Sequence, residues 1–475
     1  MNQTRHPALL LACVLLAGCM GPRPPAPEPV VPPLAWRVDP GPTVAIERDW
    51  WQAYGDPALT ALVTQALAQN DDIAIAVTRV RQADAQSRIA RAALFPTLDF
   101  EAGGTRARAI NAFGVPRAAS TGQLTLDAAY EVDLFGRISD TVGAARSSLL
   151  ASEAARDTTI LSVSAAAARG YITLRALDAQ LEVVRQTLAS RADALRLARG
   201  RAQAGYTSQL EYEQARAEYE STAQAVPQSE LAVTRQENAL AVLTGATDAS
   251  AIARGIPLQA LQQPAVPDGL PSDLLRRRPD IAQAEYTLAA TDASLSAARK
   301  AYLPRIPLTA SGGLVYATGL ANPLRIWTLG GSVLAPLFEG GRIVAGADAA
   351  AAQRDEAAYA YRRVALTAFR EVNDNLAAVQ KLGEQEARLR EQRDALAAAL
   401  RHATNRYRAG YSPYLEQLDA QRQLFSAELN LIQAHADRLN ASVALYQAMG
   451  GGWRAAPDTV AGAGGFPAVA RVRGE

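Results

Sequence analysis

The chain has 475 residues, enough for several hundred residues of ordered structure, and a formal net charge of +1 at pH 7. It contains no basic block, so nucleic acid is not expected as a partner. Aromatic residues make up 6% of the chain, whereas alanine is abundant and favours helices that pack closely.

Residues 1–18 have the pattern of a secretory signal, because Arg5 precedes an apolar stretch, Ala8–Ala17, that is too short to span a bilayer. The Leu-Ala-Gly-Cys sequence that ends at Cys19 resembles the lipobox of bacterial lipoproteins. That resemblance implies that Cys19 is diacylated and becomes the first mature residue, and Met20 behind it favours sorting to the outer membrane. An ordinary signal peptide with an incidental cysteine is the alternative.

A proline-rich tether follows the lipobox within residues 19–49. Gly21–Pro33 reads GPRPPAPEPVVPP, a composition that should stay extended and unable to pack. We therefore expect a spacer between a membrane anchor and a folded body.

The folded body opens with two helices. Asp56-Pro57 predicts a helix start, because proline suits the first helical position. A second helix is expected from about Asp72 to Leu94, ending before Phe95-Pro96. Asp71 and Asp72 are adjacent residues that point apart, so we interpret them as capping the helix and complementing its dipole.

After Pro96 the apolar residues alternate with polar ones, as in strands. The clearest strand has an apolar set at every second position, and Asp127 and Thr125 are among the polar residues between them. A second pair of strands is expected after Pro304, its last member marked by Trp327, Leu329, Val333 and Leu337. We expect strands of about ten residues or more, long enough to cross a bilayer when tilted. The alternative is a sheet of a soluble protein with one solvent-exposed face.

Two long, proline-free helices are expected at about Ile138–Ala202 and Val344–Arg408. About 65 residues at 1.5 Å each span about 100 Å, the length of a structure that bridges a gap between membranes. Each ends at a Gly-Tyr turn and is followed by a return helix; the first return helix contains Pro227, which should break or kink it. The apolar residues of these helices recur in heptads, a pattern that also suits an antiparallel coiled-coil hairpin in a soluble bundle.

The two halves of the body resemble each other. RYRAGYSPYLEQLDAQR at Arg406–Arg422 matches RAQAGYTSQLEYEQAR at Arg201–Arg216 with a constant offset, and Asp72-Ile73-Ala74 recurs at Asp280-Ile281-Ala282. Self-similarity at this distance predicts two copies of one large unit. We expect repeats at residues 50–245 and 271–453, a connector at 246–270 that could wrap the body as a belt, and a disordered tail at 454–475.

Several motifs resemble those of TolC-like outer-membrane factors of multidrug efflux, in their lipoprotein branch of the OprM/NodT type. The strands of each half end in a shared signature, DLFGRI at Asp133–Ile138 and PLFEGGRI at Pro336–Ile343. The opening passage matches the family at Trp50, Trp51, Tyr54, Asp56, Pro57, Leu59, Leu62, Ala66, Asn70 and Ala76. The resemblance covers roughly Trp50–Trp453.

Given a membrane location, the strand count itself predicts a trimer. Four strands cannot close a barrel, and open edges are not tolerated in lipid. Three chains would supply twelve strands, and the family resemblance implies the same assembly. The expected fold is mostly α with a β-barrel part: two tandem repeats, each a β-hairpin plus long coiled-coil helices, in a trimer whose 12-stranded outer-membrane barrel continues as a periplasmic α-helical barrel.

No catalytic constellation emerges from the sequence. Of three histidines, His6 lies in the signal, while His402 and His435 lie on separate predicted helices, so a metal site is not expected. Nucleophile, phosphate-loop and dinucleotide motifs are also missing from the sequence. We expect no enzyme activity and no cofactor, apart from the covalent lipid on Cys19.

By resemblance, the start of the second return helix lines a constricted aperture. The matching positions imply a ring of three Leu415 side chains and carboxylate rings from Glu416 and Asp419, which would repel one another and favour cations or protons. The alternative is that both acids are solvated residues stabilised by the helix dipole. The tip turns would contact a periplasmic adaptor through Gly205, Tyr206, Ser208, Gly410, Tyr411 and Ser412.

The resemblance implies the exit duct of a tripartite drug or xenobiotic efflux pump, in the outer membrane of a Gram-negative bacterium. The partners would be two further copies of the chain, a periplasmic adaptor protein, an inner-membrane transporter of the RND type and outer-membrane lipid. One alternative is the outer-membrane channel of a type I protein secretion system. Another is a periplasmic coiled-coil scaffold or adhesin, which would not account for the four alternating strands.

Overall fold

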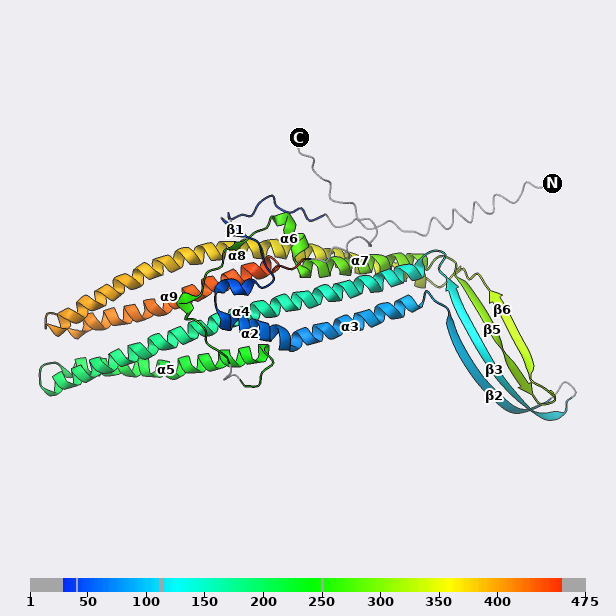
Figure 1. The fold of residues 1–475 in the computed structure, drawn as a ribbon, viewed down its shortest axis with the longest axis horizontal. Helices are drawn as coiled ribbons and strands as arrows, with labels where there is room; N and C mark the ends of the chain where they lie inside the picture. The colour runs from blue at the N-terminus through cyan, green and yellow to red at the C-terminus, as the bar shows by residue number, and fades with distance from the viewer. Residues whose placement is uncertain (1–28, 40–41, 111–113, 249–251, 455–475) are drawn as a thin grey trace, which may run out of the picture.

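The structure is a computed structural model, and it describes residues 29–39, 42–110, 114–248 and 252–454. The expected lipidation site at Cys19 and nearly all of the expected tail lie outside these residues. A curved sheet forms one end of the elongated molecule, and two long helical hairpins reach the opposite end side by side (Figure 1).

The elements of the first half run from a short 3-10 helix to a long helical hairpin. They are η1 (Trp50–Tyr54), α2 (Pro57–Gln69), α3 (Asp71–Ala92), β2 (Thr97–Ile110), β3 (Pro116–Val132), α4 (Arg137–Gln203) and α5 (Gln209–Leu243). A linking segment then carries η3 (Leu258–Ala260) and β4 (Val266–Pro267), which pairs in parallel with β1 (Thr43–Val44).

The second half has the same order of two helices, two strands and two helices. It consists of α6 (Pro271–Arg277), α7 (Pro279–Lys300), β5 (Ile306–Ala317), β6 (Leu324–Gly331), α8 (Arg342–Arg408) and α9 (Tyr414–Ala448). None of the helices in the described residues combines the length and hydropathy that a membrane-spanning helix requires.

The four long strands form one antiparallel sheet in the order β2-β3-β5-β6. Its register places apolar residues in rows across all four strands. One row is Leu98, Ala128, Ala310 and Leu329, and the next is Phe100, Leu126, Gly312 and Trp327. Most of these larger side chains are exposed, from 52% for Leu126 to 76% for Trp327. We call this side of the sheet the apolar face.

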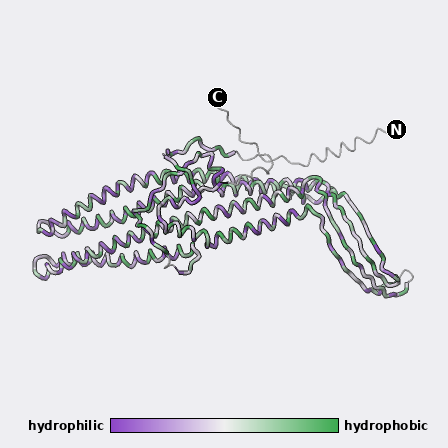
Figure 2. The backbone as a smooth tube through the Cα atoms, viewed as in Figure 1, coloured by the Kyte–Doolittle hydropathy of each residue, from purple (hydrophilic) through white to green (hydrophobic). Residues whose placement is uncertain are grey.

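The opposite side of the sheet is polar, as the alternation predicts. Asp99 lies opposite Asp127, which lies opposite Ser311, and Thr105 hydrogen-bonds Thr121 with an oxygen–oxygen distance of 2.8 Å. Along the strands, hydrophobic and hydrophilic residues alternate (Figure 2). The sheet therefore has two chemically different sides, and within the described residues neither end strand has a partner on its outer edge.

The fourth strand is shorter than expected. β6 ends at Gly331, after 8 residues, so Val333 and Leu337 lie beyond it and are 69% and 96% exposed. Consecutive glycines at 330–331 and Pro336 weaken further pairing, since glycine is poorly suited to strands and proline lacks a ladder donor. One isolated bridge, between Arg305 and Leu334, continues the ladder.

The two long helices are confirmed. α4 and α8 each contain 67 residues, about 100 Å at 1.5 Å per residue. Glycines with φ of 75° and 85° precede them, at Gly136 and Gly341, and turn the chain from sheet to helix. Asp133 accepts hydrogen bonds from the backbone N–H groups of Ile138 and Ser139. Burial raises the pKa of Asp133, but hydrogen bonds from Ser139 and its neighbours outweigh this and lower it.

Two local predictions need correction. Pro227 does not break the return helix: α5 continues through it to Leu243, because the packing of α5 against α4 holds a helix that lacks one backbone hydrogen bond. The cap of α3 is Asn70, whose side chain accepts from Asp72 N–H and Ile73 N–H. Asp71 and Asp72 instead occupy the first turn, where they complement the dipole.

The tether is also less isolated than its composition suggests. Val30 and Trp36 pack against the core cluster that includes Phe369 on α8, and Trp36 donates to the Gly269 carbonyl at 2.8 Å. The expectation that Gly21–Pro33 cannot pack is therefore wrong for Val30, because the chain lies against α8 before it reaches η1.

The main core lies midway along the helices. It joins η1 and α2 to the middle of α4, to the linking segment and to the second half of α9, with Tyr54, Leu59, Tyr171, Leu240 and Leu439 fully buried. The tyrosine hydroxyls within it are paired. Tyr54 contacts Ser442 at 2.7 Å, and burial raises the pKa of Tyr54 far above its ordinary value.

Candidate channel tip and aperture

The two helical tips have the same backbone geometry. At the end of α4, Gly205 has φ of +77° and the N–H of Tyr206 donates to the Arg201 carbonyl at 2.9 Å. At the end of α8, Gly410 has φ of +78° and the N–H of Tyr411 donates to the Arg406 carbonyl at 2.9 Å. No atom lies within 4 Å of a Cβ built on either glycine, so the left-handed conformation alone favours glycine at these turns.

Aromatic side chains project from both turns. Tyr206 is 86% exposed and Tyr411 is 82% exposed. So large an exposed fraction is unusual for a tyrosine side chain of a folded protein. Ser208 caps α5 by accepting from Glu211 N–H at 3.4 Å, whereas the Ser412 hydroxyl is buried without a partner. The two tips thus present similar aromatic surfaces at the same end of the molecule (Figure 1).

The expected aperture residues share one face of α9. Leu415, Glu416 and Asp419 are exposed, whereas Tyr414, Gln417 and Leu418 are buried on the other face. Glu416 lies 3.4 Å from Arg406 of α8, and Asp419 accepts from the Gln423 amide at 2.6 Å. The spacing of three and four residues puts both carboxylates on the same side of the helix as Leu415.

Beneath this face, a small core joins the two tips. It contains Ala198, Ala215, Tyr407, Tyr414 and Leu418, and the rings of Tyr407 and Tyr414 are 5.5 Å apart. The Arg201 guanidinium lies 4.9 Å from the centre of the Tyr407 ring. Burial and the neighbouring Glu211 carboxylate raise the pKa of Tyr407 to about 12, so its hydroxyl stays protonated at neutral pH.

Farther from the tip turns along the helices, a buried ion cluster connects the two helical hairpins. Arg191 of α4 pairs with Glu218 of α5 at 2.7 Å, and Arg422 of α9 donates to the same carboxylate at 2.9 Å. Arg191 and Glu218 are 5% and 7% exposed. Burial lowers the pKa of Arg191, and the Glu218 charge opposes that effect. The sequence offered a weak signal for this cluster, since Arg422 interrupts the apolar seam of its helix.

The linking segment crosses the middle of the helices and is fastened by polar contacts. The Tyr171 hydroxyl donates to Asp56 at 2.7 Å and accepts from Gly255 N–H at 2.9 Å. On α9, His435 lies 3.2 Å from the Leu258 carbonyl and 3.1 Å from Glu386 of α8. Asp56, which the sequence placed at the start of α2, therefore also anchors the linking segment.

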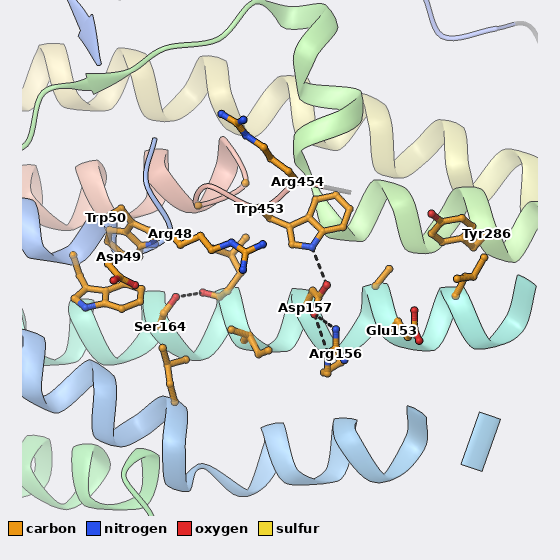
Figure 3. Close-up of a pocket in the computed structure, with 18 residues that line it drawn as sticks. Arg48, Asp49, Trp50, Glu153, Arg156, Asp157, Ser164, Tyr286, Trp453 and Arg454 are labelled. Atoms are coloured by element: carbon orange, nitrogen blue, oxygen red, sulfur yellow. Dashed lines mark hydrogen bonds and ion pairs between the residues drawn. The ribbon is translucent and has the colours of Figure 1, made fainter. Parts of the chain in front are cut away.

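A pocket of about 470 Å³ lies where the two ends of the folded body meet on α4. Figure 3 shows Trp453 directed toward Asp157, to which its indole N–H donates at 2.8 Å; Arg48 and Trp50 come from the start of the body and Tyr286 from α7. Trp50 also stacks on Tyr446 with ring centres 5.5 Å apart. Trp50 thus joins the beginning of the body to its end.

The described residues contain no group of three or more His, Cys, Asp or Glu side chains that could hold a metal ion. His435 on α9 contacts Glu386 and the linking segment, and His402 lies on a different helix, α8. Apart from the Ser412 hydroxyl and the Gln417 side-chain oxygen, the buried polar groups described above are paired, most of them at helix junctions. They hold the helices in position.

Comparison with known proteins identifies the family. Residues 62–246 and 270–451 match the model of the outer membrane efflux protein family. The chain is 38% identical over 409 residues to the solvent efflux pump outer membrane protein SrpC of Pseudomonas putida, covering 84% of this chain and 86% of that protein. It is 37% identical over 435 residues to outer membrane protein OprJ of Pseudomonas aeruginosa, covering 88% of this chain and 89% of that protein.

Solved structures agree with this assignment. The outer-membrane channel OprN superposes with a TM-score of 0.84 at 29% identity, covering 92% of this chain and 99% of that one. The Campylobacter jejuni CmeC outer membrane channel gives 0.84 at 27% identity, covering 90% of this chain and 95% of that one.

The chain therefore belongs to the outer membrane efflux protein family. It is an outer-membrane component of an efflux pump with the fold of a TolC-like channel, and the resemblance seen in the sequence is confirmed. The relatives described here give no support to the protein-secretion alternative.

Proposed function

We propose that three copies of this chain form the exit duct of a tripartite drug or xenobiotic efflux pump. The observation that carries the proposal is the four-stranded sheet, with an exposed apolar face and two open edges. Such a face suits lipid, and lipid does not tolerate unpaired strand edges. Pairing β2 of one copy with β6 of the next closes a barrel of about twelve strands.

The helices extend this closure away from the membrane. α3, α4, α7 and α8 pack in sequence, each against the next, in the same order as the four strands. A threefold arrangement that closes the sheet would also bring α8 of one copy beside α3 of its neighbour. The polar side of the sheet would then face a water-filled passage that continues between the helices for about 100 Å.

Docking to other pump components would occur at the tips. The exposed Tyr206 and Tyr411, on rigid turns at Gly205 and Gly410, are suited to contact a periplasmic adaptor, since exposed aromatic side chains favour protein interfaces. Ser208 and Ser412 lie in the same turns. The adaptor would connect the duct to an inner-membrane transporter of the RND type, which supplies the energy.

The exposed face of α9 would form the constricted end of the duct. Threefold symmetry would place three copies each of Leu415, Glu416 and Asp419 around one axis. Leucines would narrow the opening, and the carboxylates would attract cations and repel anions. The chain itself would act as a passive conduit, without catalysis or cofactor.

The N-terminus would add a second attachment to the membrane. We infer that residues 1–18 are removed, that Cys19 carries the lipid, and that residues 19–49 lead to the first unit at 50–245. The connector at 246–270 and the second unit at 271–453 would follow. Nucleic acid is not expected among the partners.

Accumulation of a fluorescent efflux dye tests the function. Cells lacking the gene should accumulate more dye than wild-type cells, and the intact gene should restore efflux. A matched Gly410→Ala variant, which strains the tip turn without touching the sheet, should restore less efflux while still assembling as a trimer. Equal dye accumulation with and without the gene, together with loss of a protein from the medium, would instead favour secretion.

A further inference from the structure

Three arginines interrupt the apolar face of the sheet near its far end. The register places Arg106 and Arg108 of β2 on the same side as Leu98 and Phe100, because all four occupy alternate positions of one strand. On β6, Arg325 lies opposite Leu314, which lies opposite Leu124, so it also belongs to the apolar face. We call these three residues the outer arginine cluster.

The cluster has no partner within the described part of the chain. All three side chains are exposed, and none forms a hydrogen bond or an ion pair with another described residue. An unpaired guanidinium on a lipid-facing surface is costly within hydrocarbon. It is favourable only where the surface reaches the polar headgroups.

The position of the outer arginine cluster along the strands matches the level of the polar headgroups. On β3 the apolar face runs from Tyr130 to Gly122, which is about 26 Å along the strand at about 3.3 Å per residue. At a strand tilt of about 40°, this length spans about 20 Å of the bilayer. Arg106 and Arg108 lie opposite Ser120 and Ala118, just beyond this band, whereas Arg325 is level with Leu124, at the outer end of the band. The end of the sheet at which β5 leads into β6 points away from the helices (Figure 1), so this is the cell-surface side of the membrane.

We propose that the outer arginine cluster binds phosphate groups carried by lipids of the outer leaflet. Arginine pairs with phosphate through two parallel hydrogen bonds, and the cluster continues a surface that already contacts lipid. The inference rests on the proposed trimer in one respect. Pairing β2 with β6 of the next copy would put Arg106 and Arg108 on the edge strand that adjoins the strand of that copy's Arg325, so arginines of two copies would border each subunit boundary.

Arg117 provides a matched control from the same hairpin end. It lies opposite Ala109, on the polar side of the sheet, and it too is exposed and unpaired among the described residues. A general effect of positive charge would involve Arg117 as much as the cluster. Binding of lipid-borne phosphate would involve only the cluster.

The test measures lipid retained by the full-length trimer. Wild type, the triple variant Arg106→Gln/Arg108→Gln/Arg325→Gln and Arg117→Gln are each placed in phosphatidylethanolamine nanodiscs that contain a small fraction of lipid A. Native mass spectrometry then counts bound lipid A, and parallel samples contain lipid A without its phosphates. We expect wild type and Arg117→Gln to retain about tenfold more of the phosphorylated form, and the triple variant to lose this preference.

Three results would overturn the proposal: an unchanged preference in the triple variant, an equal loss in Arg117→Gln, or displacement of lipid A by excess inorganic phosphate, which would indicate a site for free anions. Trimer formation and dye efflux are measured for the same proteins. A wild type that forms no trimer would contradict the proposed function, whereas a trimer without lipid preference would contradict only this inference.

Discussion

Gly255 is the position where a single added carbon should disturb the centre of the molecule. Its backbone N–H donates to Tyr171, and a Cβ built on it would lie 2.0 Å from a carboxylate oxygen of Asp56. Asp56 is buried and fixed by Tyr171 and by Ala58 N–H. We expect Gly255→Ala to destabilise the protein by about 1–3 kcal/mol and to lower the melting temperature of the purified protein.

Gly200→Ala is the matched control. Gly200 lies inside α4, and no atom comes within 4 Å of its Cβ position, so alanine should raise stability by about 0.5–1 kcal/mol through backbone entropy. A Gly255→Ala protein that melts at the wild-type temperature would show that the linking segment is held by other contacts.

The structural role of a single residue could be predicted from the sequence where the residue acts on its immediate neighbours in the chain. Asp56-Pro57 was predicted as a helix start because the cap and the proline lie next to the helix that they begin. The pairing of Glu218 with Arg422 could not be predicted, because the partners are 204 positions apart and meet only after both hairpins have packed. The lipid, aperture and adaptor roles of individual residues remain predictions.

Between helices, Glu386 is the charge on which several contacts depend. Its side chain, 3% exposed, accepts from Arg390 at 2.6 Å and from Arg438 at 3.1 Å, and His435 lies beside it. Burial raises the pKa of Glu386, but hydrogen bonds and charges from Arg438 and His435 outweigh this and lower it. The contacts join α8 to α9 and, through His435, to the linking segment.

This lowered pKa predicts a loss of stability in acid. The contribution of ionised Glu386 is fully present above its unfolded pKa of about 4.3, and it disappears as the pH falls through the lower folded pKa. We expect Glu386→Gln to melt below wild type at pH 7, and the gap between the two melting temperatures to narrow below about pH 4.

Glu391→Gln serves as the control for this pH series. Glu391 pairs with Arg388 on the surface of α8, with 70% of its side chain exposed, and exposed pairs contribute little. Its melting curve should follow wild type throughout. A constant gap between wild type and Glu386→Gln from pH 7 to pH 3 would contradict the assigned cause.

The helices were predicted more accurately than the strands. Glycines mark both ends of α4 and α8, and the predicted bounds differ from the observed ones by no more than two residues. Pro227 was expected to break or kink α5, and the break is wrong, since tertiary packing carries the helix through it. The length of β6 was overestimated because alternation continues past Gly330–Gly331, where backbone pairing stops.

In the assembled channel, the carboxylates of α9 should control the passage of ions. Replacing Asp419 would remove three like charges from the proposed ring, together with the hydrogen bond from Gln423. We expect Asp419→Ala to raise single-channel conductance in planar bilayers by about twofold or more and to weaken cation selectivity, with a larger increase when Leu415→Ala is added.

Asp437→Ala is the comparison for this measurement. Asp437 lies on the same helix and accepts from Gln433 at 2.8 Å, the same four-residue arrangement, but it is far from the tip. Its conductance should match wild type. Unchanged conductance in trimeric Asp419→Ala would remove Asp419 from the aperture.

The open edges of the sheet have a genetic consequence. Lipid does not tolerate unpaired strand edges, so in the proposed trimer each copy would depend on two others to close β2 and β6 and reach its working state. A variant that still trimerises but blocks the passage would therefore be inherited as dominant. If such an allele were expressed equally with the normal one and the copies mixed freely, only about one trimer in eight would be wholly normal.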